Sequence, residues 1–174
     1  MRDNFLPAKK VAMALHHLIS TQFPRDYLGI VGFSETARIL TAEQLPEVSW
    51  DFVYGTNMQH GFMLARKLLA RESGTKQIIM ITDGKPSAIS LPDGRIYKNA
   101  FGLDPYVLRE TFAEVAACRR AGILINTFML ASDYSLVHFV QKVAEICRGK
   151  AYFTTPYTLG QYLLMDYMSK KTRH

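Results

Sequence analysis

The chain has 174 residues, of which 48% are apolar and 21% charged, and a formal net charge of +6. This balance predicts one globular domain over residues 1–174, and the basic residues are too scattered to indicate nucleic-acid binding. No apolar stretch approaches the ~20 residues of a membrane-spanning helix, and the start lacks the apolar core of a signal peptide. The two cysteines match no metal spacing, so a reducing compartment, the cytoplasm, is expected.

In the first part of the chain, apolar residues at helical spacing follow Pro7, which suits the first turn of a helix. Two apolar runs separated by three residues then predict an antiparallel hairpin. Thr56 or Asn57 is suited to cap the next helix. In chain order we expect a helix from Pro7 to Pro24, a hairpin at 27–33 and 37–40, a loop at 46–55 and a helix ending at Gly74.

The rest of the chain alternates strands and helices, which indicates an α/β layered fold. The expected elements are a strand at 77–82, a surface hairpin at 91–96, a helix at 105–121, a strand at 123–130, a helix from about 136 to Gly149, a strand at 151–154 and a helix at 159–169. No internal repeat or linker divides them, so a single domain is predicted.

The strand at 77–82 ends on Asp83 and Gly84. An unbroken apolar run bounded by turn residues is typical of a strand buried on both faces of a parallel sheet. Such sheets bind ligands at the carboxyl ends of their strands. Asp83 is therefore the first candidate for a functional residue.

Thr56 and Asp83 both lie where a polar ligand could be held, at a helix start and at a strand end. A hydroxyl and a carboxylate are oxygen donors of the kind that Mg²⁺ prefers. The alternative interpretations are structural: Thr56 as a helix cap, and Asp83 as a turn former that bonds the following amides. The residues alone leave both interpretations open.

Three motifs in order resemble a von Willebrand factor type A domain, and more closely its bacterial branch similar to the magnesium-chelatase D subunit. They are the hairpin with Gly32-Phe33-Ser34, the run Tyr54-Gly55-Thr56-Asn57-Met58 and the run Ile81-Thr82-Asp83-Gly84-Lys85-Pro86. The ending Ala151-Tyr152-Phe153-Thr154-Thr155-Pro156 fits as well. The resemblance implies a Rossmann-like three-layer sandwich whose mostly parallel sheet has one antiparallel edge strand.

The resemblance also implies a metal-ion-dependent adhesion site for Mg²⁺ or Mn²⁺. In that family the site combines an Asp-x-Ser-x-Ser motif, a loop threonine and a later aspartate, which Thr56 and Asp83 match here. A carboxylate of the partner commonly completes the metal shell. The residues expected to shape the partner surface around these two are Ser34, Asn57, Gly84, Ser132 and Asp133.

The chain departs from the family in one respect: the Asp-x-Ser-x-Ser motif and the central first strand that carries it are expected just ahead of Met1, and neither occurs in the sequence. With only Thr56 and Asp83 remaining, no tightly bound metal is expected in this chain. The domain is interpreted as truncated at its N-terminus. The strands at 28–33 and 78–82 are then expected either to pair with each other or to have the gap filled by another copy, giving a homo-oligomer.

The leading hypothesis is a non-enzymatic protein-interaction module with no catalytic residues, working with a AAA+ ATPase of the magnesium-chelatase or MoxR-like type. The alternative is a magnesium-dependent phosphoryl-transfer enzyme that uses Asp83. No phosphate loop of the G-x-x-x-x-G-K-[ST] type supports that alternative.

Overall fold

The computed structural model describes residues 2–48, 55–99 and 101–171. Its helices are α1 (Arg2–Gln22), α2 (Met58–Leu69), α3 (Pro105–Arg120), α4 (Tyr134–Cys147) and α5 (Leu159–Lys171), with a 3-10 turn η1 (Leu45–Glu47). Its strands are β1 (Ile30–Phe33), β2 (Ala37–Leu40), β3 (Lys76–Thr82), β4 (Ala88–Ser90), β5 (Ile96–Lys98), β6 (Ile123–Met129) and β7 (Ala151–Phe153). The predicted α/β fold with a mostly parallel sheet is confirmed. The loop expected at 46–55 lies partly outside the described residues.

The centre of the fold is a parallel sheet in the order β3-β6-β7. β3 pairs with β6 along its whole length, from Lys76 opposite Ile123 to Thr82 opposite Met129. Every residue of β6 except Leu124 is buried, because helices cover both faces of this strand. The carboxyl ends of β3 and β6 therefore meet at one edge of the sheet.

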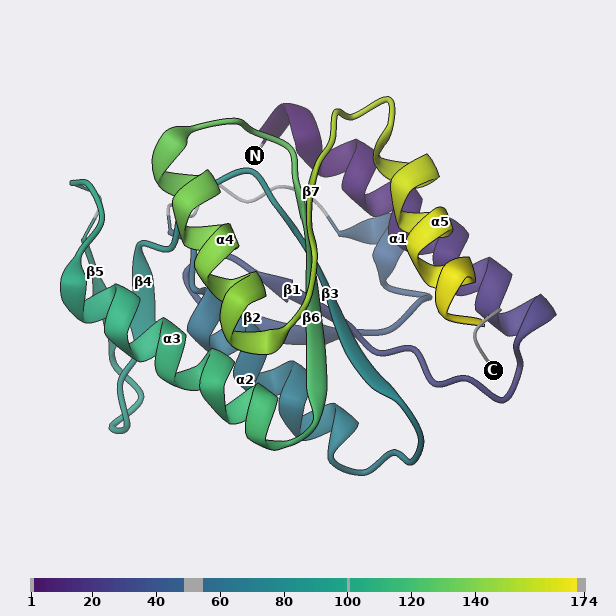
Figure 1. Ribbon diagram of the computed structural model, residues 1–174, viewed down its shortest axis with the longest axis horizontal. Helices are drawn as coiled ribbons and strands as arrows, with labels where there is room; N and C mark the ends of the chain where they lie inside the picture. Colours follow the sequence, from purple (N-terminus) through teal and green to yellow (C-terminus); the bar gives the residue numbers. More distant parts are fainter. Residues whose placement is uncertain (1, 49–54, 100, 172–174) are drawn as a thin grey trace.

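Two helix layers enclose the sheet (Figure 1). α2, α3 and α4 lie on one face, where Met58, Val115 and Phe139 belong to one buried cluster with side chains of β3 and β6. α1 and α5 lie on the other face, where Leu15 and Leu163 are buried with residues of β6. The result is the three-layer sandwich that the sequence predicts.

Helix α1 begins earlier than expected. Pro7 lies inside the helix, not in its first turn, because α1 starts at Arg2. Because Pro7 has no backbone N–H, the helical hydrogen bond from residue 7 to the carbonyl of Asp3 cannot form. Packing of the downstream apolar residues of α1, such as Leu15 and Ile19, against α5 and β6 offsets that loss.

β1 and β2 form a separate antiparallel pair, with Ile30 opposite Leu40 and Phe33 opposite Ala37. The sequence predicts this hairpin, but direct pairing of β1 with β3 is wrong, since the described strands form separate sheets. The hairpin is tied to α2 instead: the backbone N–H of Ala37 donates to Nδ1 of His60 at 2.9 Å. Within the described residues, one edge of β3 consequently has no neighbouring strand.

A second antiparallel pair, β4 and β5, carries the surface turn at Asp93-Gly94. The paired residues run from Ala88 opposite Lys98 to Ser90 opposite Ile96. Of the range 91–96 expected for the hairpin, only Ile96 belongs to a strand, and residues 91–95 are the connecting loop. Gly94 has φ of 88°, a left-handed conformation that favours glycine.

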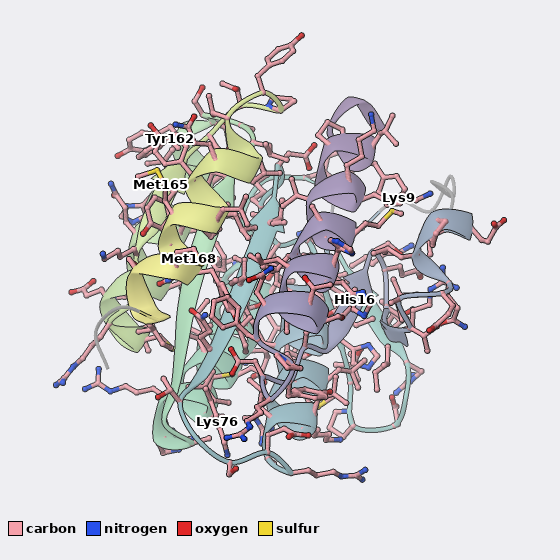
Figure 2. The ribbon with its side chains drawn as sticks, turned by 90° about the vertical axis from the view of Figure 1, so that its right-hand side faces the viewer. Lys9, His16, Lys76, Tyr162, Met165 and Met168 are labelled. Atoms are coloured by element: carbon pink, nitrogen blue, oxygen red, sulfur yellow. The ribbon has the colours of Figure 1, made fainter. Side chains whose placement is uncertain are left out.

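Helix α5 is apolar on its outer side as well as its inner side. Leu163 and Tyr167 face the core, whereas Tyr162, Met165 and Met168 point outward and are 40%, 59% and 41% exposed (Figure 2). Apolar side chains on the outer side of a helix present surface suited to burial against another element. In the described part of the chain, no helix combines the length and apolar character needed to span a membrane.

Candidate functional site

The start of α2 is fixed by the buried side chain of Asn57. Its Oδ1 accepts the backbone N–H of His60 at 2.9 Å, so Asn57 is the helix cap. Its Nδ2 donates to the carbonyl of Glu35 and to Oγ of Ser90, both at 3.0 Å. Its own N–H donates to the carbonyl of Ser34 at 2.7 Å. One side chain therefore joins α2, the turn between β1 and β2, and β4, and it holds the preceding threonine in place.

That threonine, Thr56, lies against the segment that follows β3. Its N–H donates to Oγ of Ser87 at 3.0 Å, and its carbonyl accepts from the N–H groups of Ser87 and Ala88 at 3.0 and 3.2 Å. Its hydroxyl oxygen is 3.6 Å from the point where a Cβ would lie at Gly84. The structure thus brings Thr56 beside the Asp83-Gly84 turn, although the two segments are far apart in sequence. We call Thr56 and this turn the candidate site.

The turn itself is held by Thr82, the last residue of β3. The buried hydroxyl of Thr82 donates to the carbonyl of Gly84 at 3.0 Å and accepts its N–H at 3.3 Å. The next strand is joined at the same point, because the N–H of Leu130 donates to the carbonyl of Thr82 at 2.9 Å. Asp83, which is half-buried, is therefore presented from a rigid turn at the carboxyl end of the sheet.

The remaining residues expected at the partner surface differ in exposure. Ser34, Ser132 and Asp133 are exposed, Gly84 is half-buried, and Asn57 is fully buried. Asn57 therefore acts within the fold, by positioning Thr56. Ser132 and Asp133 follow β6, and the carboxylate of Asp133 caps α4 by accepting the N–H of Leu136 at 3.2 Å.

Three residues that support the candidate site were not identified from the sequence. Ser87 and Ser90 bond the Thr56-Asn57 segment directly, and His60 ties the β1–β2 hairpin to α2. Partial burial, and next the positive charge of Lys67, lower the pKa of His60. A lowered pKa keeps Nδ1 free to accept the hydrogen bond. Serines after a strand-end turn carry no periodic signal, so only their contacts reveal them.

The donors present at the candidate site are too few for a stable magnesium centre. Mg²⁺ prefers six oxygen ligands, and among the described residues of the candidate site the side-chain donors are the Thr56 hydroxyl and the Asp83 carboxylate. Throughout the stretches that the structure describes, no group of three or more His, Cys, Asp or Glu side chains could hold a metal ion. These two residues fit part of a metal shell, and further oxygen ligands from elsewhere are needed to fill it.

A family model described as "Rv0959-like protein, vWA domain" matches residues 1–168. Two relatives, protein Rv0959 of Mycobacterium tuberculosis and protein Mb0984 of Mycobacterium bovis, are each 32% identical to this chain over 177 aligned positions. The match covers 99% of this chain and 26% of each relative, so the chain spans about a quarter of their length.

Solved structures of other proteins share the fold of this chain. A von Willebrand factor type A protein from Catenulispora acidiphila aligns with a TM-score of 0.62 at 16% identity, covering 90% of this chain and 36% of that one. Proximal thread matrix protein 1 from the mussel byssus aligns with the same TM-score at 14% identity, covering 91% and 39%. At these identities the likeness concerns the fold alone.

Proposed function

This chain belongs to the family of Rv0959-like von Willebrand factor A (vWA) domains, and from that premise we propose that it is a protein-interaction module. Its contact surface is the candidate site and the exposed loops beside it, which carry Ser34, Ser132 and Asp133. The proposal assigns no catalytic residue to the chain.

The observation that supports this proposal most is the placement of Thr56 beside the Asp83-Gly84 turn. A hydrogen bond to Ser87 holds the backbone of Thr56, and the hydroxyl of Thr82 holds the turn that carries Asp83. Little conformational entropy is therefore lost at the candidate site when a partner binds. Exposed polar loops on a rigid scaffold are a common form of recognition surface. The placement at the carboxyl ends of β3 and β6 agrees with the ligand-binding end of α/β sheets.

We further propose that Mg²⁺ or Mn²⁺ takes part in binding when additional oxygen ligands are supplied. Thr56 and Asp83 hold one side of the ion, and a partner carboxylate and residues beyond this chain hold the other. The ion would contribute a strong electrostatic link between two negatively charged groups. On its own, this chain is expected to bind the ion weakly, because Mg²⁺ gives up its water shell reluctantly.

The edge of β3 that has no neighbouring strand among the described residues bears on where those extra ligands come from. Ile78, Ile79 and Ile81 are only half-buried, although they belong to the apolar run at the centre of β3. An unpaired apolar edge is a ready template for another strand. We propose that a strand from the remaining polypeptide of a longer protein covers this edge, with a second copy of the domain as the alternative, and that it carries the missing metal ligands.

The partner that we propose is a AAA+ ATPase of the magnesium-chelatase or MoxR-like type. This part rests on the resemblance of the motifs around Thr56 and Asp83 to the magnesium-chelatase D branch. The alternative of phosphoryl transfer by Asp83 requires a cluster of further carboxylates close by, and the described residues contain no group of three or more His, Cys, Asp or Glu side chains that could hold a metal ion.

The test is binding of a MoxR-like ATPase from the same organism to the full-length protein, with Mg²⁺ or with EDTA. Thr56→Val removes the hydroxyl at constant shape, and Asp83→Asn removes the charge. Both variants should weaken Mg²⁺-dependent binding at least tenfold, whereas Thr56→Ser should restore it. Asp93→Asn, in the remote β4–β5 loop, is the matched control. Equal binding by Asp83→Asn and the parent protein contradicts the metal-assisted mechanism.

A further inference from the structure

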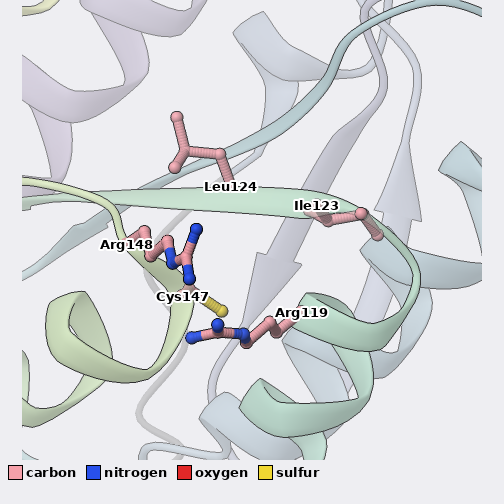
Figure 3. Close-up of a pocket in the computed structure, with 6 residues that line it drawn as sticks. Arg119, Ile123, Leu124, Cys147 and Arg148 are labelled. Carbon is pink, nitrogen blue, oxygen red and sulfur yellow. The ribbon is translucent and has the colours of Figure 1, made fainter.

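A shallow depression lies at the other end of the sheet, where β6 begins. Its volume is about 260 Å³, and it lies between the ends of α3 and α4 (Figure 3). The residues that line it are Arg119, Gly122, Ile123, Leu124, Cys147 and Arg148. We call this depression the basic pocket. It is separate from the candidate site, which lies at the carboxyl ends of the strands.

The basic pocket contains two guanidinium groups that form no ion pair with a carboxylate of the described residues. Figure 3 shows the side chains of Arg119 and Arg148 next to Cys147, whose sulfur is drawn between the two guanidinium groups. Nη1 of Arg119 donates to the carbonyl of Ile146 at 2.7 Å, which fixes its orientation and leaves other N–H donors available. Across the described ranges, the ion pairs formed by arginine involve neither of these two residues.

The backbone at Arg148 is unusual in a way that concerns the pocket. Arg148 caps α4 with φ of 54°, and it is the one non-glycine residue with positive φ among those the structure describes. Glycine or asparagine ordinarily fills such a left-handed position. The neighbouring Gly149 is required for a different reason, since a Cβ there would come within 1.6 Å of the Ile125 carbonyl oxygen. An arginine is thus kept at a position that disfavours it, with its side chain at the pocket.

The thiol of Cys147 lines the basic pocket but is not a reactive group. It is 4% exposed, it donates to the Val115 carbonyl at 3.2 Å, and burial raises its pKa. A thiol with a raised pKa is a poor nucleophile. The apolar side chains of Ile123 and Leu124 complete the lining. The available chemistry is therefore that of two guanidinium groups, one held by its bond to Ile146 and one exposed on Arg148, beside the apolar side chains of Ile123 and Leu124.

We propose that the basic pocket binds a phosphate-type dianion between Arg119 and Arg148. Two guanidinium forks match the charge and the several acceptor oxygens of phosphate better than those of a single carboxylate. The simpler explanation is that both arginines only compensate the negative ends of α3 and α4. That explanation accounts for the positions of the two charges. It does not explain why arginine, and not glycine or asparagine, occupies the left-handed position 148.

The experiment titrates the protein with inorganic phosphate at constant ionic strength and follows backbone amide NMR shifts around Gly122 and Arg148. O-phospho-L-serine is the second ligand, and sodium chloride and acetate are the controls. We expect a saturable shift with phosphate, and a loss of affinity of at least tenfold in Arg148→Asn and in Arg119→Gln. Arg120→Gln, on the exposed neighbour at the end of α3, should bind as the parent does.

Unfolding cannot explain a loss in Arg148→Asn, because asparagine tolerates the left-handed conformation and should raise the melting temperature. Saturation by phosphate alone assigns the pocket to the free anion, and equal binding of O-phospho-L-serine assigns it to phosphomonoesters. A linear, non-saturating shift overturns the proposal. So does phosphate binding that is unchanged in Arg148→Asn. Neither result depends on metal or partner binding at Thr56 and Asp83.

Discussion

The carboxylate of Asp166 accepts both hydrogen bonds that the side-chain amide of Asn126 donates, at 3.0 and 2.8 Å, inside the core. Asn126 is 0% exposed and Asp166 is 3% exposed. The hydroxyl of Tyr152 donates to the same carboxylate at 2.8 Å, and Oδ1 of Asn126 accepts the N–H of Lys150 at 2.8 Å. This network joins β6, β7 and α5, and it fixes which side of α5 faces the sheet.

Asp166→Ala is expected to lower the free energy of unfolding by about 3 kcal/mol, because it leaves the Asn126 amide and the Tyr152 hydroxyl buried without an acceptor. Denaturation by urea measures the change. Tyr152→Phe is the control: it removes one donor and should cost about 1 kcal/mol. A smaller loss for Asp166→Ala than for Tyr152→Phe would show that the network does not hold α5.

Gly149→Ala is expected to be one of the most damaging single substitutions in the chain. The new Cβ would lie 1.6 Å from the carbonyl oxygen of Ile125, so the backbone of β6 has to move. We expect a loss of roughly 3 kcal/mol or more in the free energy of unfolding. Gly160→Ala in α5 is the contrasting variant, since its Cβ meets only Val11 at an ordinary 3.6 Å. It should gain about 0.5 kcal/mol, and equal effects of the two variants would refute the packing argument.

The bond between Ala37 and His60 is expected to make the β1–β2 hairpin sensitive to acid. Nδ1 of His60 has to be unprotonated to accept it, and burial lowers the pKa of this histidine below its ordinary 6.5. The unfolded state therefore binds the proton more readily, so this contribution to stability is complete above pH 6.5 and declines as the pH falls below that value. His60→Gln, which keeps an acceptor, should reduce the loss of stability between pH 7 and 5 (roughly the range where histidine titrates). An unchanged pH profile in that variant would contradict the assignment.

The carboxylate of Asp104 provides a second pH-dependent contact, at the start of α3. The hydroxyl of Tyr97 donates to it at 2.6 Å and the Asn99 amide at 3.0 Å, and these bonds lower the pKa of Asp104 from 3.8 to about 2. Its contribution to stability is present above pH 3.8 and is lost as the pH falls toward about 2. Tyr97→Phe should raise the pKa of Asp104, as measured by NMR titration of the carboxyl carbon. Titration of Asp104 near its ordinary value in the parent protein would show that the bond to Tyr97 is not formed in solution.

The sequence was sufficient to predict the order and type of the elements. β3 and β6 follow from unbroken apolar runs, and the position of Asp83 follows from the end of such a run. The sequence predicts Thr56 or Asn57 as the cap of α2, and the hydrogen bond from the His60 N–H identifies Asn57. These are local properties, because the strand, helix and turn preferences of a segment depend mainly on its own residues.

Only the tertiary structure decided how the elements are joined. The β1–β2 hairpin is attached to α2 through His60 and Asn57 and is not paired with β3, because side-chain bonds to its backbone orient it. Because α5 has apolar residues on both sides, its sequence does not predict which side faces the sheet. The bond from Asn126 to Asp166 determines that side. What the sequence by itself determined is therefore the set of segments and the residues at their ends. The placement of Thr56 beside Gly84 and that of Arg119 and Arg148 at the basic pocket required the fold, because both depend on the relative placement of distant segments.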